Sequence, residues 1–289
     1  MTAVAVAPPA GVCTQATLRE DIVVAGRFQL KERLGRGSMA EVFRAVDRAA
    51  GREVAVKIAA DGSLKNRQRI TNEAHVLANL DHPSVITFLA EGIMPGDGPL
   101  SGRPFIVEEL AFGPSLADAA RGPRPVPQQV AGWAAGLFDA LSHLHGRGVV
   151  HRDIKPANLM LSGLRRSPVR IVDFGIAAAA GAAPEPGMSS GTVHYMSPEQ
   201  ASGGSAQPAW DVYALGLVLL ELLTGTRAYA GTAVESLVAR TLRGPAIPAS
   251  LGPGWGALLR ATTAMESGAR PSAAEAAVMA RKLAVSLVR

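Results

Sequence analysis

Three side chains that could act on a phosphoryl group lie within one short segment, VVHRDIKPANLM, at residues 149–160. Asp153 offers a carboxylate that can accept or orient the proton of a hydroxyl group, and Lys155 offers a cation for the moving phosphoryl group. Asn158 adds an amide oxygen, which is a suitable ligand for Mg²⁺. Phosphoryl transfer needs all three kinds of group, so the segment indicates this chemistry if the remaining parts lie elsewhere in the chain.

A second metal ligand is expected at the end of another strand. The segment VRIVDFG, residues 169–175, places Asp173 directly after an apolar run that is typical of a strand. Carboxylate and amide oxygens are the ligands that a hard cation prefers. Asp173 and Asn158 are therefore the predicted metal ligands.

A glycine-containing turn and a strand lysine could hold the rest of a nucleotide. In LGRGSMAEV, residues 34–42, Gly35 and Gly37 lie between two predicted strands, where glycine lets the backbone approach a negative group. This pattern alone is more often an ordinary hairpin turn. In VAVK, Lys57 points to where a phosphate under that turn would lie, and Glu73 on the following helix is its candidate partner.

Hydrophobic periodicity indicates the elements that must position these residues. Three runs after Phe28 alternate in the manner of strands and are separated by glycine turns, which predicts three antiparallel strands. Residues 66–80 have apolar side chains at helical spacing, and two more strands are expected before residue 110. After residue 115 the pattern becomes helical. We therefore predict a small β-rich lobe followed by a larger helical lobe.

Composition and charge argue against several classes of protein. The 289 residues carry a formal net charge of +5 without a run of five basic residues, so no nucleic-acid partner is expected. Residues 1–26, rich in Ala, Pro and Thr, predict a flexible tail without a signal peptide, and no membrane span is expected. The single cysteine, Cys13, cannot form an internal disulfide, which fits a reducing compartment. We therefore expect a cytoplasmic protein.

Seven motifs follow one another in a recognisable order: the glycine loop, VAVK, the helix glutamate, HRDIKPAN, DFG, GTVHYMSPE and WDVYALG. In this order and spacing they resemble the catalytic domain of bacterial eukaryotic-like (Hanks-type) serine/threonine protein kinases. The resemblance covers roughly residues 27–285. It implies a bilobal α+β protein kinase domain at 27–286, with an N-lobe at 27–109, a hinge at 109–113 and a C-lobe at 114–286.

The resemblance also implies roles for the catalytic residues. Lys57 would hold the α- and β-phosphates of ATP and pair with Glu73. Asp153 would be the catalytic base, and Lys155 would contact the γ-phosphate. For His151 and Phe174 it implies packing rather than catalysis.

The cofactors implied are ATP and a divalent cation, Mg²⁺ or alternatively Mn²⁺, bound by Asn158 and Asp173. The adenine would lie between Leu34, Val42, Ala55 and Met160 and bond to the hinge backbone at Glu109 and Ala111. The nucleotide-binding positions implied are Leu34, Gly35, Arg36, Gly37, Ser38, Met39, Ala40, Glu41, Val42, Ala55, Lys57, Glu109, Ala111 and Met160.

Seven further positions are implied to be structural. Four side chains would stack as a spine between the lobes, one aspartate would anchor the spine, and one buried ion pair would brace the C-lobe. These are Leu77, Phe88, His151 and Phe174 for the spine, Asp211 for the anchor, and Glu199 with Arg270 for the ion pair.

The sequence departs from the family pattern in a few places. Ala40 replaces the third glycine of the phosphate loop, and Ser197 stands where alanine is commoner; both changes are small. Glu108 falls at the gatekeeper position beside the adenine pocket, where an apolar or hydroxyl side chain is usual. A carboxylate buried there must be paired, protonated or turned toward solvent. The alternatives are an alignment that is off by one residue, or a nearby cation that Glu108 reaches.

The activation segment, residues 173–199, has small residues and few anchors. Phosphorylation of Ser189 or Ser190 would create charge-assisted bonds to Arg152, the family's receptor for a loop phosphate. Two serines in a linker is the equally weighted alternative. The resemblance assigns Thr192 first to substrate positioning, through bonds to Asp153 and Lys155, and only second to phosphorylation.

The leading prediction is an Mg·ATP-dependent serine/threonine protein kinase that acts on protein substrates and phosphorylates its own activation loop, with a homodimer as one route to phosphorylation in trans. The alternative is a pseudokinase, a nucleotide-binding scaffold that signals without phosphotransfer. A small-molecule phosphotransferase of similar fold is a third reading. Such enzymes generally lack the GT…SPE segment that this chain has.

Overall fold

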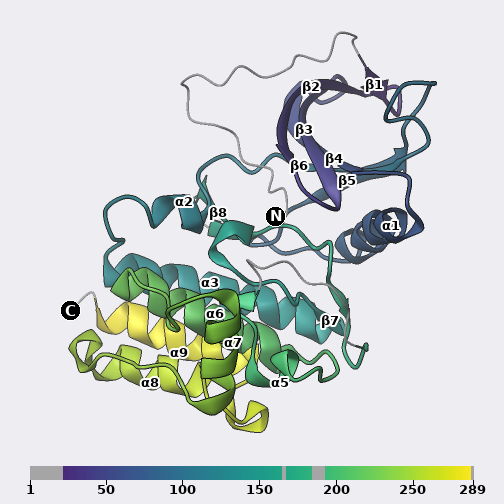
Figure 1. Ribbon diagram of the computed structural model, residues 1–289. Helices are drawn as coiled ribbons and strands as arrows, with labels where there is room; N and C mark the ends of the chain where they lie inside the picture. The colour runs from purple at the N-terminus through teal and green to yellow at the C-terminus, as the bar shows by residue number, and fades with distance from the viewer. Residues whose placement is uncertain (1–21, 165–166, 184–192, 288–289) are drawn as a thin grey trace.

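The computed structural model describes residues 22–164, 167–183 and 193–287 and has two lobes (Figure 1). The N-lobe contains an antiparallel sheet and one long helix, and the C-lobe is mainly helical. This bilobal α+β arrangement confirms the predicted fold class.

Six strands form the N-lobe sheet in the order β1-β2-β3-β4-β6-β5, and all neighbouring pairs are antiparallel. The strands are β1 (Val23–Val24), β2 (Phe28–Arg36), β3 (Ala40–Asp47), β4 (Arg52–Ala59), β5 (Phe88–Ile93) and β6 (Pro104–Glu109). The five strands predicted from alternation correspond to β2 through β6.

Strand β1 was not predicted, and the tail expected at residues 1–26 extends too far. Val23 and Val24 pair with the start of β2, and Val24 is fully buried. The turn between the strands has positive φ at both Ala25 (50°) and Gly26 (62°), the geometry of a tight hairpin turn. Two β-branched residues next to such a turn are enough to extend the sheet.

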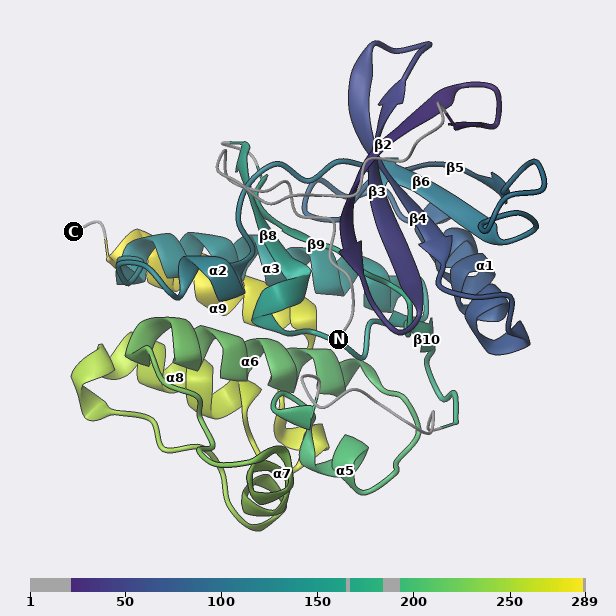
Figure 2. The same cartoon turned by 45° about the horizontal axis from the view of Figure 1, so that its top comes forward.

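The two faces of the sheet have different neighbours. In β4, Val54, Val56 and Ile58 pack into the core of the sheet itself. On the opposite face of β4, Lys57 and Ala59 lie against helix α1 (Leu64–Ala78), as the period of two requires. Figure 2 shows α1 beside the sheet at the boundary between the lobes.

Helix α1 is held at its start and along one face. The Ser63 side chain accepts a hydrogen bond from the Asn66 backbone N–H, which is a standard N-cap. Ile70, Ala74 and Leu77 lie three or four residues apart and are buried in the main core. Glu73 shares this buried face, so packing of the helix directs a carboxylate toward β4.

Helices and short strands make up the C-lobe. Among the described residues its α-helices include α2 (Leu116–Ala119), α3 (Pro127–Gly146), α5 (Pro198–Ala201), α6 (Pro208–Thr224), α7 (Ala233–Leu242), α8 (Gly252–Thr262) and α9 (Ala273–Ser286). Strand β7 (Val149–Val150) pairs with β10 (Ala178–Ala179), and β8 (Leu159–Leu164) pairs with β9 (Ser167–Ile171). No helix in the described ranges is long and apolar enough to cross a bilayer.

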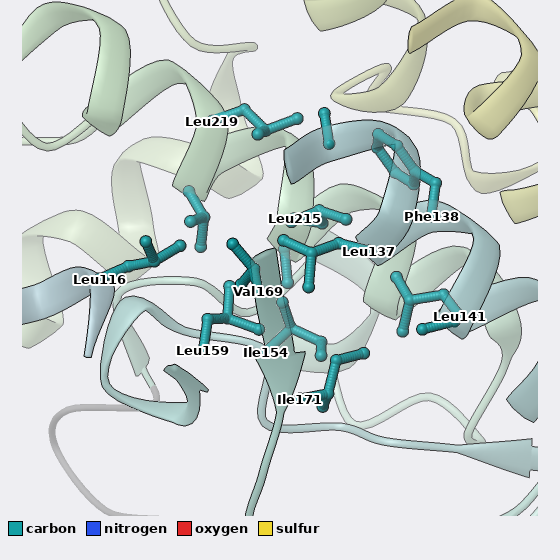
Figure 3. Packing of buried hydrophobic residues seen from close by; sticks show 14 of the residues in the cluster. Leu116, Leu137, Phe138, Leu141, Ile154, Leu159, Val169, Ile171, Leu215 and Leu219 are labelled. Carbon is teal, nitrogen blue, oxygen red and sulfur yellow. The ribbon is translucent and has the colours of Figure 1, made fainter. Parts of the chain in front are cut away.

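The C-lobe core reaches from its helices to the strands at the lobe boundary. Leu137 and Leu141 of α3 and Leu215 of α6 pack with Leu159 and Ile171, which belong to the β8–β9 hairpin (Figure 3). Each of these side chains is buried. The loops that begin and end at this hairpin therefore rest on a fixed apolar base.

Candidate active site

A buried ion cluster joins the two lobes. The Lys57 Nζ atom lies 2.7 Å from Glu73 Oε1 on α1 and 2.7 Å from Asp173 Oδ1, which follows β9. The backbone N–H of Phe174 also donates to Glu73 Oε1, at 3.0 Å. The structure thus brings together three predicted site residues that are far apart in the sequence.

A second cluster lies in the loop after β7. The Lys155 Nζ atom is 2.7 Å from Asp153 Oδ2, and the Asn158 side-chain amide donates to Asp153 Oδ2 at 3.1 Å and to its carbonyl at 2.9 Å. All three residues are buried. The acid, the cation and the amide of the opening segment therefore form one hydrogen-bonded unit.

Asp211, in the first turn of α6, holds the backbone of this loop. Its carboxylate accepts the backbone N–H groups of His151 and Arg152, at 2.8 and 2.9 Å, and His145 Nε2 lies 2.9 Å away. Arg152 has φ of 67°, and Asp173 has φ of 64°. Positive φ is strained for residues other than glycine, and such strain persists only where surrounding contacts enforce it. Asp211 supplies that constraint at Arg152.

Two oxygen atoms suit a divalent cation. Asn158 Oδ1 and Asp173 Oδ2 are buried and have no hydrogen-bond partner among the described residues. Buried oxygens are rarely left unpaired, and an amide oxygen with a carboxylate oxygen is a donor set that Mg²⁺ accepts. The residues present therefore fit the predicted metal.

The electrostatics of the ion cluster keep Lys57 charged. Burial alone would lower the pKa of Lys57, but the bonded carboxylates of Asp173 and Glu73 outweigh burial and raise the pKa. Burial also favours the neutral form of Asp173 and would raise its pKa, but the charge of Lys57 lowers this pKa below its usual value. A cation with two bonded carboxylates is thus fixed at the lobe boundary.

An apolar patch lies on the sheet face above this cluster. Val42, Ala55 and Leu110 are buried together, with Leu34 packed against them, apart from the two larger cores. Leu34, Val42 and Ala55 are predicted adenine-pocket residues. Leu110 was not predicted, although its alternation with Glu108 in the sequence could have indicated it.

The remaining predicted nucleotide positions are dispersed around this patch. Met160 and Ala111 are buried in the main core, whereas the Glu109 side chain turns away and bonds Thr87 and Arg170. In the glycine loop, the Gly37 N–H donates to the Ala40 carbonyl at 2.9 Å.

The other loop residues have separate contacts. Gly35 pairs with Val42 and Arg36 with Glu41 across the β2–β3 hairpin, and the Ser38 carbonyl accepts from Asn66. Glu41 is buried and ion-paired with Arg33 at 3.0 Å. Met39 lines a small pocket that also includes Lys57, Glu73 and Gly175.

Comparison with known proteins agrees with this geometry. The sequence model of the family described as "Protein kinase domain" matches residues 28–278. This chain belongs to the protein kinase family. A probable serine/threonine-protein kinase of Corynebacterium efficiens is 39% identical over 217 residues, which cover 72% of this chain and 32% of that protein.

Two further relatives carry the name serine/threonine-protein kinase PknB. The protein from Mycobacterium leprae is 39% identical and the one from Mycobacterium tuberculosis is 37% identical, in both cases over 78% of this chain and 36% of the relative. The kinase domain described here therefore spans about a third of the length of the curated relatives that it matches.

The predicted spine residues of the kinase domain lie together. The rings of His151 and Phe174 meet edge to face, with centroids 4.7 Å apart. Leu77 is buried in the same apolar cluster, and Phe88 packs against that cluster. Burial lowers the pKa of His151, so the ring is neutral near pH 7, which suits packing.

The predicted ion pair of the C-lobe is bidentate. Arg270 reaches the two carboxylate oxygens of Glu199 at 2.6 and 2.9 Å. The Arg270 side chain is fully buried, but Glu199 is only half-buried, so the expectation of a buried Glu199 is wrong. Arg270 can be fully buried because carbonyl groups of the C-lobe, including that of Ala209, accept hydrogen bonds from its guanidinium in addition to the ion pair.

One buried arginine was missed by the sequence analysis. Arg240 on α7 is completely buried, and its guanidinium donates to the carbonyls of Val193, His194 and Met196, which lead into α5. Ser236, one helical turn earlier, accepts from the same group at 2.6 Å. The pair Ser236 and Arg240, four residues apart, could have indicated a polar helix face.

Glu108 lies on the inner face of β6, opposite Ala55 of β4. It is 5% exposed, and its Oε1 atom has no hydrogen-bond partner among the described residues. Burial raises the pKa of Glu108 to about 8, with Glu73 acting in the same direction and Lys57 against it. A carboxyl group at this position could be paired, protonated or turned toward solvent, and the protonated, neutral form fits the structure best.

The candidate residues of the activation segment, Ser189, Ser190 and Thr192, lie outside the described residues.

Proposed function

We propose that this kinase domain transfers the γ-phosphate of ATP to serine and threonine hydroxyls of proteins, its own activation segment included. Membership of the protein kinase family and the names of the relatives support this reaction. The observation that carries the proposal is the pair of clusters at the lobe boundary, one around Lys57 and the other around Asp153.

The N-lobe cluster is suited to holding the nucleotide phosphates. Lys57 stays charged between two carboxylates, so it can bind phosphate oxygens without losing its position. Glu73 on α1 holds the lysine in place and also accepts a hydrogen bond from the Phe174 backbone N–H. The apolar patch on the same sheet face offers a surface for the base, with the hinge backbone alongside it.

The C-lobe cluster is suited to activating the acceptor hydroxyl. Asp153 would accept or orient the hydroxyl proton, and Lys155, bonded to the same carboxylate, would stabilise charge on the transferred group. Asn158 holds Asp153 through two hydrogen bonds and leaves its own Oδ1 available. We propose that Asn158 and Asp173 bind Mg²⁺, or Mn²⁺ in its place, which would neutralise charge on the phosphates.

The same proposal includes how the kinase domain is regulated and where in the cell it acts. A phosphate on Ser189 or Ser190 would form charge-assisted hydrogen bonds with Arg152, and Thr192 would position the acceptor residue. A homodimer would allow one copy to phosphorylate another. Because ATP and protein substrates meet in the cytoplasm, we place the domain there, with strands and helices from β1 to α9 forming the catalytic unit.

Label transfer from γ-labelled ATP tests the proposed reaction. The wild type, Asp153→Asn and Asp139→Asn would be incubated with Mg²⁺, with and without a generic protein substrate. Asp139 is an exposed aspartate on α3, so its substitution is a matched control. We expect label in the wild type and the control, and a loss of at least about a hundredfold in Asp153→Asn. Equal label in all three would contradict the role of Asp153, and nucleotide binding without label would favour a pseudokinase.

A further inference from the structure

The inner face of the N-lobe sheet carries one carboxyl group that the proposed reaction does not use. Ile106 and Glu108 of β6 and Leu110 directly after it point to this face, while Phe105 and Val107 pack into the core of the sheet. Two of the three inward residues are apolar and have apolar neighbours. Glu108 is the exception.

The register of the sheet places Glu108 between two parts of the nucleotide site. Its partner across the ladder is Ala55, a member of the apolar patch with Val42 and Leu110. Two residues further along β4, on the same face, lies Lys57. Glu108 is therefore flanked by the surface proposed for the base and by the cation proposed for the phosphates.

The chemical state of Glu108 favours hydrogen bonding with a neutral ligand group. Its Oε1 atom is buried and lacks a partner in the described ranges, which is costly for a polar group. The charged groups that act on it are Lys57 of β4, Glu73 of α1 and Asp173 after β9, and none of them hydrogen-bonds Glu108. A neutral carboxyl group can accept through one oxygen and donate through the other.

We propose that Glu108 is a specificity-determining residue of the nucleotide site, which recognises the purine edge by accepting a hydrogen bond from the 6-amino group of adenine. This inference rests on the proposed use of ATP. A flat base on the Val42, Ala55 and Leu110 patch would bring its edge to the neighbouring position on the same sheet face. The bond would satisfy the unpaired carboxyl oxygen, so it would form without displacing another protein contact.

A comparison of two nucleotides in three proteins tests this contact. The nucleotides are ATP and purine riboside triphosphate, in which hydrogen replaces the 6-amino group. The proteins are the wild type, Glu108→Gln, which keeps a carbonyl oxygen, and Glu108→Met, which does not. Dissociation constants are measured with Mg²⁺ by displacement of a fluorescent nucleotide, so the readout does not require phosphotransfer.

We expect removal of the amino group to weaken binding about five to ten times more in the wild type and Glu108→Gln than in Glu108→Met, as one net hydrogen bond predicts. Contacts of the amino group with the hinge cancel in this ratio. An equal loss in all three proteins would overturn the proposal. Binding of ATP without phosphotransfer would count against the proposed function alone, whereas absence of ATP binding by the wild type would overturn both.

An infrared measurement keeps the proposal testable if Glu108→Met does not fold. The C=O stretching band of the neutral Glu108 carboxyl group is assigned by its absence in Glu108→Gln. We expect this band to shift when ATP binds and to stay in place when purine riboside triphosphate binds. A band that is unchanged by ATP, or that shifts equally with both nucleotides, would overturn the proposal.

Discussion

Replacement of Glu108 by glutamine is expected to change how stability depends on pH. The pKa of this side chain is about 8 in the folded protein, against an ordinary value of 4.5. Between these values the unfolded chain releases a proton that the folded protein retains. The free energy of unfolding of the wild type therefore falls as pH rises through this interval, and the contribution is constant below and above it.

The size of the effect follows from the width of the interval. One bound proton corresponds to about 1.4 kcal/mol per pH unit, so the whole interval amounts to about 5 kcal/mol. Glutamine has the same shape and does not titrate. The stability of Glu108→Gln minus that of the wild type should thus grow by about 1.4 kcal/mol for each unit between pH 5 and pH 8.

Urea unfolding at a series of pH values measures this difference. Far-UV circular dichroism is the suitable signal because the three tryptophans, Trp133, Trp210 and Trp255, all lie in the C-lobe. Glu91→Gln on the neighbouring strand β5, where the side chain is exposed, is the matched control and should show no such growth. Parallel curves for the wild type and Glu108→Gln would refute the reasoning, because they would mean that Glu108 is ionised in the folded protein.

Two other substitutions test contacts of the C-lobe. A Cβ atom at Gly216 in α6 would lie 2.6 Å from Thr262 Oγ1, so Gly216→Ala should lower the free energy of unfolding by about 1–3 kcal/mol, measured by urea denaturation. Arg240→Met leaves three carbonyls without their donor and should cost about 3 kcal/mol or more, with a raised KM for peptide substrate. Arg243→Met, at an exposed position three residues later, should have little effect in either assay, and equal behaviour of the two arginine variants would contradict the role of Arg240.

The sequence allowed the site to be predicted where the residues that act together are also close to one another in the chain. Asp153, Lys155 and Asn158 are so close in the chain that a single loop had to bring them together. The strands of the N-lobe were predictable because alternation reports two different faces. The pairing of Lys57 with Glu73 needed only that a helix follow the strand, and packing of α1 directs Glu73 inward.

Other contacts had no local signal. Strand β1 depends on a turn in which Ala25 has positive φ, and an alanine in the sequence does not indicate such a conformation. The carbonyls that Arg240 binds lie more than forty residues earlier in the chain, so helix periodicity could show its face but not its partners. Glu108 could be recognised from the sequence as unusual, but its neutral state depends first on its burial and then on Glu73 and Asp173, which the fold brings near.

The anchoring of the His151 and Arg152 amides by Asp211 has a dynamic consequence. The acceptor of both N–H groups lies in the first turn of α6, a helix that is buried along nearly its whole length. Exchange of these amide protons with solvent therefore requires disruption of the C-lobe core rather than local opening of a loop. We therefore expect slow amide exchange at His151 and Arg152, measured by hydrogen–deuterium exchange, although both residues lie in an irregular segment next to Asp153.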